Sequence, residues 1–226
     1  MTDYLKKALA EWSWADIEML VENEVEEDTT FELKEDLSSD GNDPWQASQK
    51  KISGQARDSL AKEIVAFANA YGGTIALGIV ESKDQPPRAT SFKLIKKCVE
   101  CAERLEQAIR QIVDPPLSGF EVKGIKKPNS EGDGAVILRV ASSLSAPHGH
   151  GRPPQAYVRR SNKSEPLTMR DLHDRFWEAR SRRERVEKIL EERKAILLGF
   201  LGKRASGHLI NDRMGRLKFE VQHGLI

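Results

Sequence analysis

The segment Ala66–Ile79, with the sequence AFANAYGGTIALGI, decides the fold predicted for this chain of 226 residues. Apolar residues at helical spacing lead into it and form one stripe: Leu60, Ile64, Phe67, Ala68 and Tyr71. Gly72 and Gly73 follow the stripe directly, where a helix favours a left-handed glycine cap. The next stretch, Thr74–Val80, is apolar on both alternating faces, as is typical of a central strand with cover on each side. We therefore expect a helix, a glycine cap and a buried strand.

Further elements are predicted on both sides of this segment. Trp14–Asn23 is typical of a short helix capped by Ser13, and Phe31–Glu35 alternates apolar and charged residues like a half-buried strand. Asp36–Gly54 is polar and is expected to be a surface loop. A helix near Ile95–Val113 and three strands complete the pattern, the strands being Phe120–Ile125, Ala135–Val140 and Gln155–Arg160. The first two of these are expected to pair as a hairpin. The predicted fold class is α/β (α+β), a mixed β-sheet flanked by helices.

The C-terminal part of the chain has a different pattern. Thr168–Leu201 is predicted to be one long charged helix that begins with an approximate capping box of Thr168 and Asp171. Its apolar residues are loosely spaced between charges, as in a helix that either projects from the protein or packs in an oligomer. A short strand-like segment, Leu217–Val221, follows it. We expect a domain over residues 1–167 and a helix with a tail over 168–226, a candidate dimerisation element.

Composition narrows the class of protein. Charged residues make up 31% of the chain and the mean hydropathy is −0.55. No apolar run approaches the roughly 20 residues that a membrane helix needs, and the N-terminus lacks the pattern of a secretion signal. Only two cysteines are present, Cys98 and Cys101, which argues against a disulfide framework. On a helix, two such residues are expected to be core residues rather than zinc ligands. These features predict a cytoplasmic protein with no membrane partner.

Four residues are candidates for phosphodiester chemistry. Glu32 and Lys34 form a Glu-x-Lys pair on one face of a predicted strand, an arrangement in which a carboxylate holds a metal and a lysine stabilises phosphate charge. Glu27 lies five residues earlier, and Glu81 follows the predicted central strand, where sites in α/β proteins gather. If the two strands are neighbours, three carboxylates and one amine converge. Asn69 is expected to be a buried structural amide.

Five segments in this order resemble the Schlafen-type AlbA-like domain, also described as a divergent AAA ATPase-like domain. They are FELKE, AKEIVAFANAYGGTIALGI, IVDPP, VILRVASSLSAPH and AYVRRSNKSEPLT, and the resemblance spans Glu27–Met169. Members show an early acid, Glu-Phe-Lys, a helix that ends in Ala-Phe-Ala-Asn-x-x-Gly-Gly, and Gly-Val-Asp-Asp. Two features depart from that pattern: Gly78–Glu81 reads Gly-Ile-Val-Glu, and the loop after Lys34 is longer than usual.

The resemblance implies a catalytic site. In nuclease-active Schlafens it consists of the early acid, the Glu and Lys of Glu-Phe-Lys and the last Asp, which match Glu27, Glu32, Lys34 and Glu81 here. The three acids would hold Mg²⁺ or Mn²⁺. The implied activity is that of a metal-dependent endoribonuclease acting on structured RNA such as tRNA, in a setting of bacterial antiviral defence. Vertebrate Schlafens pair two such lobes, so a homodimer or larger homo-oligomer is expected for a single lobe.

Contacts to nucleic acid are predicted on the last strand and its neighbours. Arg159, Arg160 and Lys163 lie at the end of a predicted strand and just after it, in a segment that resembles the family's Tyr-Val-Arg ending. They are candidates to neutralise phosphates. Because Arg159 and Arg160 point to opposite faces of a strand, we expect one of them to pair with a core acid. His148 lies in the Ala-Pro-His phrase and is a candidate substrate-facing residue. Aromatic residues are only 6% of the chain, which favours structured RNA over an unstructured strand, with DNA as another possible partner.

Two other function classes remain open at this stage. The chain is also compatible with a non-catalytic nucleic-acid-binding or transcription-regulatory module. A third candidate is an ATP-binding signalling domain, which has no motif support because neither Gly-Lys-Ser/Thr nor Gly-x-Gly-x-x-Gly is present. Cleavage of RNA would favour the nuclease, binding without cleavage the regulatory module, and saturable ATP binding the signalling domain.

Overall fold

A computed structural model describes residues 7–38 and 42–204 of the chain. The chain divides into two compact units, Met1–Phe176 and Trp177–Ile226. The first unit contains all of the strands that the structure describes. In the second unit, the described residues belong to a single long helix, α5 (Met169–Arg204), which begins at the end of the first unit.

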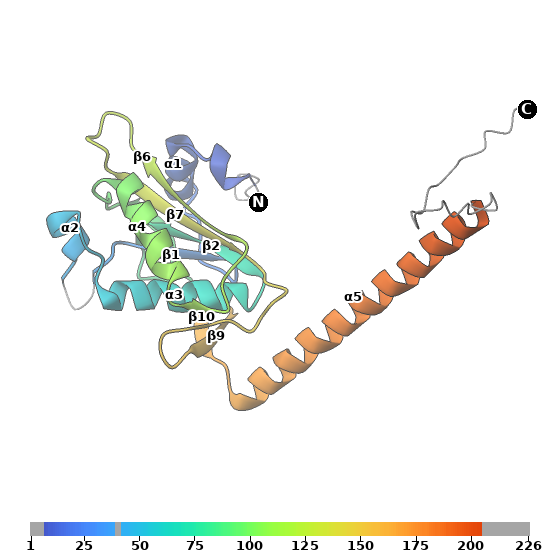
Figure 1. Cartoon of the computed structure of the whole chain (residues 1–226). Helices are drawn as coiled ribbons and strands as arrows, with labels where there is room; N and C mark the ends of the chain where they lie inside the picture. Colours follow the sequence, from blue (N-terminus) through green and yellow to red (C-terminus); the bar gives the residue numbers. More distant parts are fainter. Residues whose placement is uncertain (1–6, 39–41, 205–226) are drawn as a thin grey trace, which may run out of the picture. The chain divides into compact units, whose positions relative to one another are not determined.

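A four-stranded mixed sheet forms the centre of the first unit (Figure 1). Its strands lie in the order β1 (Phe31–Lys34), β2 (Gly72–Leu77), β7 (Gly134–Ala141) and β6 (Phe120–Lys126). β1 and β2 are parallel, whereas β7 runs antiparallel to both of its neighbours. The predicted hairpin is therefore confirmed, and so is the mixed character of the sheet.

Helices cover both faces of this sheet. On one face, α3 (Gly54–Ala68) and α4 (Cys98–Arg110) pack their buried side chains against β2, β6 and β7 and form the larger core cluster (Figure 1). On the other face lie α1 (Trp14–Glu22) and the 3₁₀ turn η2 (Leu9–Glu11). The expected cap of α1 is present, since the carboxylate of Asp16 accepts the backbone N–H of Ser13 at 2.7 Å.

Two smaller sheets extend the first unit. One consists of four short strands in the order β10-β9-β8-β5, namely β10 (Lys163–Pro166), β9 (Gln155–Arg160), β8 (Gly149–His150) and β5 (Val113–Asp114). The other is the antiparallel pair β3 (Ile79–Glu81) and β4 (Ala89–Phe92). β9 confirms the strand predicted at the same residues. It packs against α3, so this sheet closes one side of the candidate site described below.

The glycine pair does not cap the helix as the sequence analysis predicted. α3 ends at Ala68 with Asn69 as its cap in the right-handed region, and the glycines open β2 instead. Gly72 has a φ of +77°, and a Cβ atom there would lie 2.7 Å from the backbone nitrogen of Ser142. Close approach between strands, rather than helix termination, requires this glycine. Tyr71 is also outside the predicted apolar stripe, because it is 78% exposed.

The predicted strand Thr74–Val80 is divided into two. Gly78 has a φ of +101° and ends the central strand, so that β3 leaves the central sheet and pairs with β4. The expected loop Asp36–Gly54 also differs, because it contains the short helix α2 (Pro44–Ser48). Trp45 in α2 is 1% exposed, and its indole donates a hydrogen bond to the carbonyl of Lys96 at 2.7 Å. The buried Trp45 side chain and its hydrogen bond thus anchor α2 to the core.

α5 confirms the predicted long helix and its capping box. The backbone N–H of Asp171 donates to the hydroxyl of Thr168, and the Asp171 carboxylate accepts the backbone N–H of Thr168 at 3.0 Å. Leu217–Val221, predicted to be strand-like, lies outside the described residues. Within the described ranges, no helix is long and apolar enough to cross a membrane.

Candidate functional site

Strand β1 directs its two polar side chains toward α3. Phe31 and Leu33 belong to the core cluster on the α1 side of the sheet, so the alternation of a strand turns Glu32 and Lys34 to the other side. Glu32 lies opposite Ile75 in the parallel pairing with β2. The strand predicted for FELKE therefore places the Glu32 carboxylate and the Lys34 amine between the sheet, α3 and β9.

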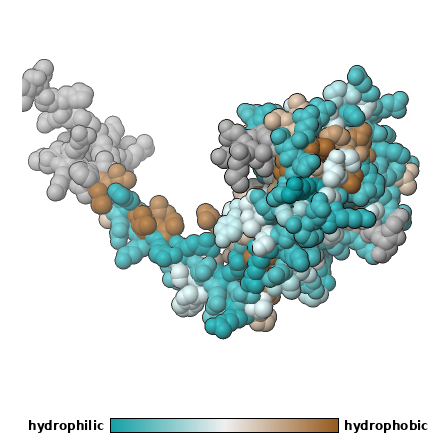
Figure 2. Space-filling view, turned by 180° about the vertical axis from the view of Figure 1, so that it is seen from behind, coloured by the Kyte–Doolittle hydropathy of each residue, from teal (hydrophilic) through white to brown (hydrophobic). Residues whose placement is uncertain are grey.

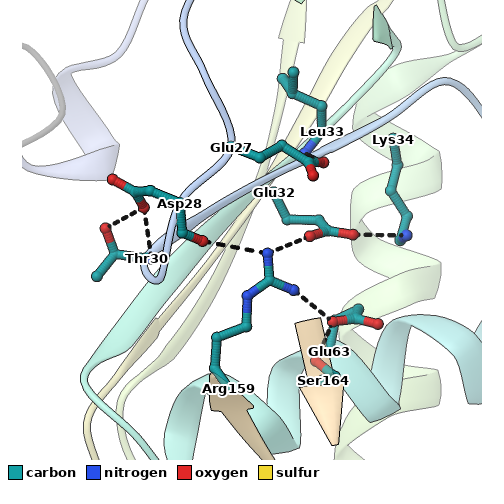
Figure 3. Close-up of polar contacts among 9 residues, drawn as sticks. All are labelled: Glu27, Asp28, Thr30, Glu32, Leu33, Lys34, Glu63, Arg159 and Ser164. Atoms are coloured by element: carbon teal, nitrogen blue, oxygen red, sulfur yellow. Dashed lines mark hydrogen bonds and ion pairs between the residues drawn. The ribbon is translucent and has the colours of Figure 1, made fainter. Parts of the chain in front are cut away.

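Arg159 is the centre of a buried ion-pair network in this space (Figure 3). Its guanidinium donates to the Glu32 carboxylate at 2.5 Å and to Glu63 of α3 at 3.0 Å. Lys34 Nζ lies 3.1 Å from the second oxygen of Glu32, and the hydroxyl of Ser164 donates to Glu63. The Arg159 side chain is 1% exposed, so this network has little access to water.

The expectation that Arg159 contacts phosphate does not match this position. Arg159 points into the protein, and both of its terminal nitrogens are held by carboxylates, so it offers nothing to a ligand at the surface. The prediction that one arginine of the pair binds a core acid is confirmed, and Arg159 is that residue. Arg160, on the opposite face of β9, is 58% exposed and pairs with Glu165 at 3.2 Å.

Glu63 is a member of the network that sequence reasoning missed. It lies in α3 between the apolar residues Leu60, Ile64 and Phe67 and is only 8% exposed. A lone charge on the buried stripe of a helix indicates a buried partner, because an ionised carboxylate is costly to bury unpaired. That signal was present in the sequence, whereas the identity of the partner, 96 residues away, depends on the fold.

Glu27 has the perturbed ionisation expected of a functional residue. Its side chain accepts the backbone N–H of Leu33 at 3.0 Å, and the residue is 7% exposed. The pKa of Glu27 is raised to about 7, first by burial and then by the negative charges of Glu32 and Glu81, against the opposing effects of the Leu33 N–H and of Arg159. Glu27 therefore lies within electrostatic reach of each of the other two predicted acids, Glu32 and Glu81. A carboxyl group that titrates near neutrality beside other charges is typical of catalytic sites.

Glu27 lines a surface pocket next to the turn between β9 and β10. The pocket has a volume of about 390 Å³, and its lining residues are Glu27, Asp28, Thr29, Gln85, Pro86, Ser161 and Asn162. Arg160 and Lys163 flank the turn Ser161–Asn162, and both are exposed. The structure thus brings Glu27 close to the two predicted phosphate contacts that remain on the surface.

Lys34 and Glu81 belong to a different hollow. A pocket of about 230 Å³ contains both of them, together with Glu35 and Asp36. Glu81 is exposed at the end of β3, which bends away from the central sheet after Gly78. Glu32 lines neither of these two pockets and lies in the buried network around Arg159. The four predicted catalytic residues therefore gather in one region without sharing one pocket.

The described residues do not form a ready-made metal site. No group of three or more Asp, Glu, His or Cys side chains in the described ranges lies close enough to hold a metal ion. Both oxygens of Glu32 already accept cationic partners, from Lys34 and Arg159. The carboxylates of Glu27, Glu32 and Glu81 are of the type that Mg²⁺ and Mn²⁺ prefer, but their arrangement does not present them to one ion.

His148 lies in the interior rather than toward a substrate. It is 1% exposed, and burial lowers its pKa, so the neutral ring is favoured. Nδ1 lies 2.7 Å from the carbonyl of Pro115, which can only accept, so Nδ1 carries the proton and Nε2 accepts the Ser143 hydroxyl at 2.6 Å. Asn69 holds the same loop by accepting the His148 backbone N–H at 2.7 Å, which confirms it as a structural amide.

With this geometry in view, the chain was compared with known proteins. Residues 27–168 match the family model described as Schlafen, AlbA_2. This match covers more than half of the 226 residues, and the chain belongs to that family. No curated protein matches it significantly. The predicted family is thereby confirmed.

Two solved structures show weaker similarity. One is the crystal structure of the DIP2311 protein from Corynebacterium diphtheriae, with 17% identity, a TM-score of 0.41 and coverage of 68% of this chain. The present chain spans only 26% of that protein's chain. The other is the solution structure of the N-terminal domain of an ATP-dependent DNA helicase RecG-related protein from Nitrosomonas europaea, with 13% identity and a TM-score of 0.37. There, the alignment covers 70% of this chain and 95% of that domain.

Proposed function

We propose that this protein binds nucleic acid at the pocket beside Glu27 and cleaves it there as an endoribonuclease, with structured RNA favoured over DNA. The observation that carries the proposal is the position of Glu27, whose pKa is about 7, in a pocket bordered by the turn between Arg160 and Lys163. Exposed cations can hold phosphates, and a carboxylate that titrates near neutrality can accept a proton.

In the proposed reaction, ionised Glu27 accepts the proton of a ribose 2′-hydroxyl. The 2′-oxygen attacks the adjacent phosphorus, the bond to the 5′-oxygen breaks, and that oxygen takes a proton from a water molecule. The hydroxide that remains takes the proton from Glu27, which restores both the water molecule and the carboxylate. The products are a 2′,3′-cyclic phosphate and a 5′-hydroxyl end. Arg160 and Lys163, which flank the turn Ser161–Asn162 that lines this pocket, would stabilise the charge that develops on the phosphate. Because the first step needs a 2′-hydroxyl, which DNA lacks, this reaction would cleave RNA and not DNA.

A dependence on Mg²⁺ or Mn²⁺ remains a separate proposal for this chain. Its support is the nature of the acidic side chains near Glu27 and the family, while the arrangement of Glu32 and Arg159 argues against a preassembled site. Cleavage assays with chelator and with Mn²⁺ therefore form two arms of the same experiment. Roles in bacterial defence and a place in the cytoplasm also stay predictions.

The deciding experiment incubates labelled tRNA with wild-type protein, with Glu27→Gln, and with the double variant Arg160→Ala/Lys163→Ala. Glu22→Gln, at an exposed acid of α1, is the matched control. We expect Glu27→Gln to bind RNA but to lose cleavage, and the double variant to lose affinity most strongly at low salt. Products that end in a cyclic phosphate would support the reaction above.

The outcomes separate the remaining candidates. Binding without cleavage in every protein would leave a non-catalytic nucleic-acid-binding or transcription-regulatory module. Equal cleavage by wild-type protein and Glu27→Gln would exclude Glu27 as the proton acceptor. Saturable binding of ATP, with no binding of RNA or duplex DNA, would favour the signalling domain.

A further inference from the structure

α5 carries an exposed apolar stripe within the unit Trp177–Ile226. The side chains are large, and each is at least half exposed: Val186 55%, Ile189 54%, Leu190 61%, Ile196 50% and Leu197 63%. Figure 2 shows hydrophobic residues gathered along part of the helix between hydrophilic ones. A helix that leaves this much apolar surface in water lacks the packing that normally stabilises it.

The spacing of the stripe is that of a coiled coil. Val186, Leu190 and Leu197 occupy positions separated by four and then seven residues, and Arg193 fills the position between the last two. Alternating steps of four and three residues define a seam along one side of a helix. Ile189 and Ile196 lie one residue before two of the seam positions and widen the apolar face on the same flank.

From this pattern we propose that two copies of the chain associate through α5 as an antiparallel coiled coil. The contact is independent of the pocket at Glu27. The argument for a second copy as the occupant is that the stripe complements itself when one copy is reversed. Aligning Val186 with Leu197 of the second copy places Leu190 against Arg193 of that copy, and every contact occurs twice by symmetry.

The flanks of the seam support the same alignment. Ile189 then lies beside Ile196 of the second copy, so both apolar flanking residues are covered. On the other flank, Glu187 lies beside Lys194 of the second copy, an attractive pair of opposite charges. The apolar residues and the charges thus agree on one register.

A parallel pair fits less well. Arg183 lies three residues before Val186 and continues the seam. In a parallel coiled coil, equivalent seam positions face each other, so Arg193 would meet Arg193, and Arg183 would meet Arg183. Two layers of like charge in the interface are strongly unfavourable. Reversing one helix removes the Arg193 pair and sets that side chain beside Leu190. The orientation follows from the positions of the arginines.

The first test is the oligomeric state of the full chain by sedimentation velocity over a range of concentrations. We expect a dimer for wild-type protein and a monomer for Leu190→Glu. Leu198→Glu is the matched control, since Leu198 is 60% exposed on the same helix but lies off the stripe. Circular dichroism would verify that both variants keep their helices. A wild-type monomer at every concentration, or equal behaviour of the two variants, would overturn the proposal.

The second test fixes the orientation. Under oxidising conditions, the double variant Val186→Cys/Leu197→Cys should form covalent dimers, whereas Val186→Cys alone should not. The native cysteines are both 0% exposed and do not interfere. Val186 and Leu197 are separated by about 16 Å along one helix, too far for a disulfide within a chain. Efficient cross-linking of Val186→Cys alone would show parallel helices and contradict the proposed orientation.

Charge reversal gives a third and independent readout. Glu187→Lys should weaken the dimer, because Lys194 of the second copy then faces a like charge. Adding Lys194→Glu to the same chain should restore the attraction and recover most of the lost affinity. A double variant that is weaker than either single variant would contradict the alignment.

Discussion

The guanidinium of Arg159 lies 2.5 Å from a carboxylate oxygen of Glu32, and this ion pair is buried, with 1% of the Arg159 side chain and 11% of the Glu32 side chain exposed. It links β9 to β1, two strands of different sheets, and Glu63 extends the link to α3. A cation supplied by the protein therefore lies beside the glutamate that the sequence analysis predicted to bind a metal. The pair holds Glu32 in the buried network, and Glu32 lines neither the pocket at Glu27 nor the pocket at Lys34 and Glu81.

Removal of Arg159 should destabilise the fold strongly. In Arg159→Met, Glu32 and Glu63 would remain buried with only Lys34 and Ser164 as partners, so we expect a loss of about 3–5 kcal/mol in the free energy of unfolding. The matched control is Arg160→Met on the same strand, whose exposed ion pair contributes less than about 1 kcal/mol. Urea denaturation of both variants measures the difference. Similar losses would contradict a buried network centred on Arg159.

Glu27 should make the stability of the protein fall as the pH rises. Its pKa is raised from 4.5 unfolded to about 7 folded, so the native state holds the proton more tightly. The stabilisation is complete below the unfolded pKa and is lost as the pH increases through 7. The loss is at most about 3 kcal/mol, because a pKa difference of one between the two states corresponds to about 1.4 kcal/mol.

Thermal unfolding at several pH values would measure this effect. Glu27→Gln should remove the decline between about pH 5 and 8, since an amide does not ionise. The exposed control Glu22→Gln should keep the wild-type profile. If wild-type protein and Glu27→Gln had parallel profiles, Glu27 would not titrate near neutrality.

Asn69 should be essential to the loop that contains His148. Its amide donates to the carbonyls of His148 and Tyr157 at 2.9 and 2.8 Å, and its oxygen accepts the His148 N–H. Asn69→Ala leaves buried groups unpaired, and we expect a loss of roughly 2–4 kcal/mol from several bonds, each with a desolvation cost of about 1–3 kcal/mol. Asn23→Ala, at the exposed C-cap of α1, is the control; it removes one exposed hydrogen bond to the Met19 carbonyl and should cost at most about 1 kcal/mol.

Alanine substitution at two glycines with positive φ should distinguish the cost of backbone strain from the cost of a steric clash. Gly72→Ala combines a φ of +77° with a Cβ position 2.7 Å from Ser142 N and 2.8 Å from Val140 O. Gly132 has a φ of +101° but no atom within 4 Å of the Cβ position. We expect Gly132→Ala to cost about 1 kcal/mol and Gly72→Ala several-fold more, measured by denaturation. Equal costs would mean that Gly72 is required for its conformation alone.

The sequence predicted the elements whose pattern is local. FELKE, the β6–β7 hairpin and the capping box of α5 were read correctly, because alternation and capping depend on neighbouring residues. The break at Gly78 and the helix at Trp45 were missed, because strand pairing with β4 and the distant carbonyl of Lys96 stabilise them. Glu63 was missed for the same reason, since its partner Arg159 is remote in sequence.

The site was predictable to a similar extent. The family motif located Glu27, Glu32, Lys34 and Glu81 in one region of the fold, where the charges of Glu32 and Glu81 act on Glu27 and Lys34 pairs with Glu32. It could not show that Arg159 lies among them or that β3 carries Glu81 toward a separate pocket. Both facts depend on how strands from three different sheets pack together, and local sequence patterns do not encode that packing.

The most direct test of the proposed function is the pH dependence of tRNA cleavage by wild-type protein and Glu27→Gln, in chelator and in Mn²⁺. Because Glu27 must be ionised to accept a proton, the wild-type rate should rise through its pKa of about 7 and then level off. Glu27→Gln should retain RNA binding and lose at least about 100-fold in rate. A Glu27→Gln variant that cleaves at the wild-type rate, with the same pH profile, would contradict the account.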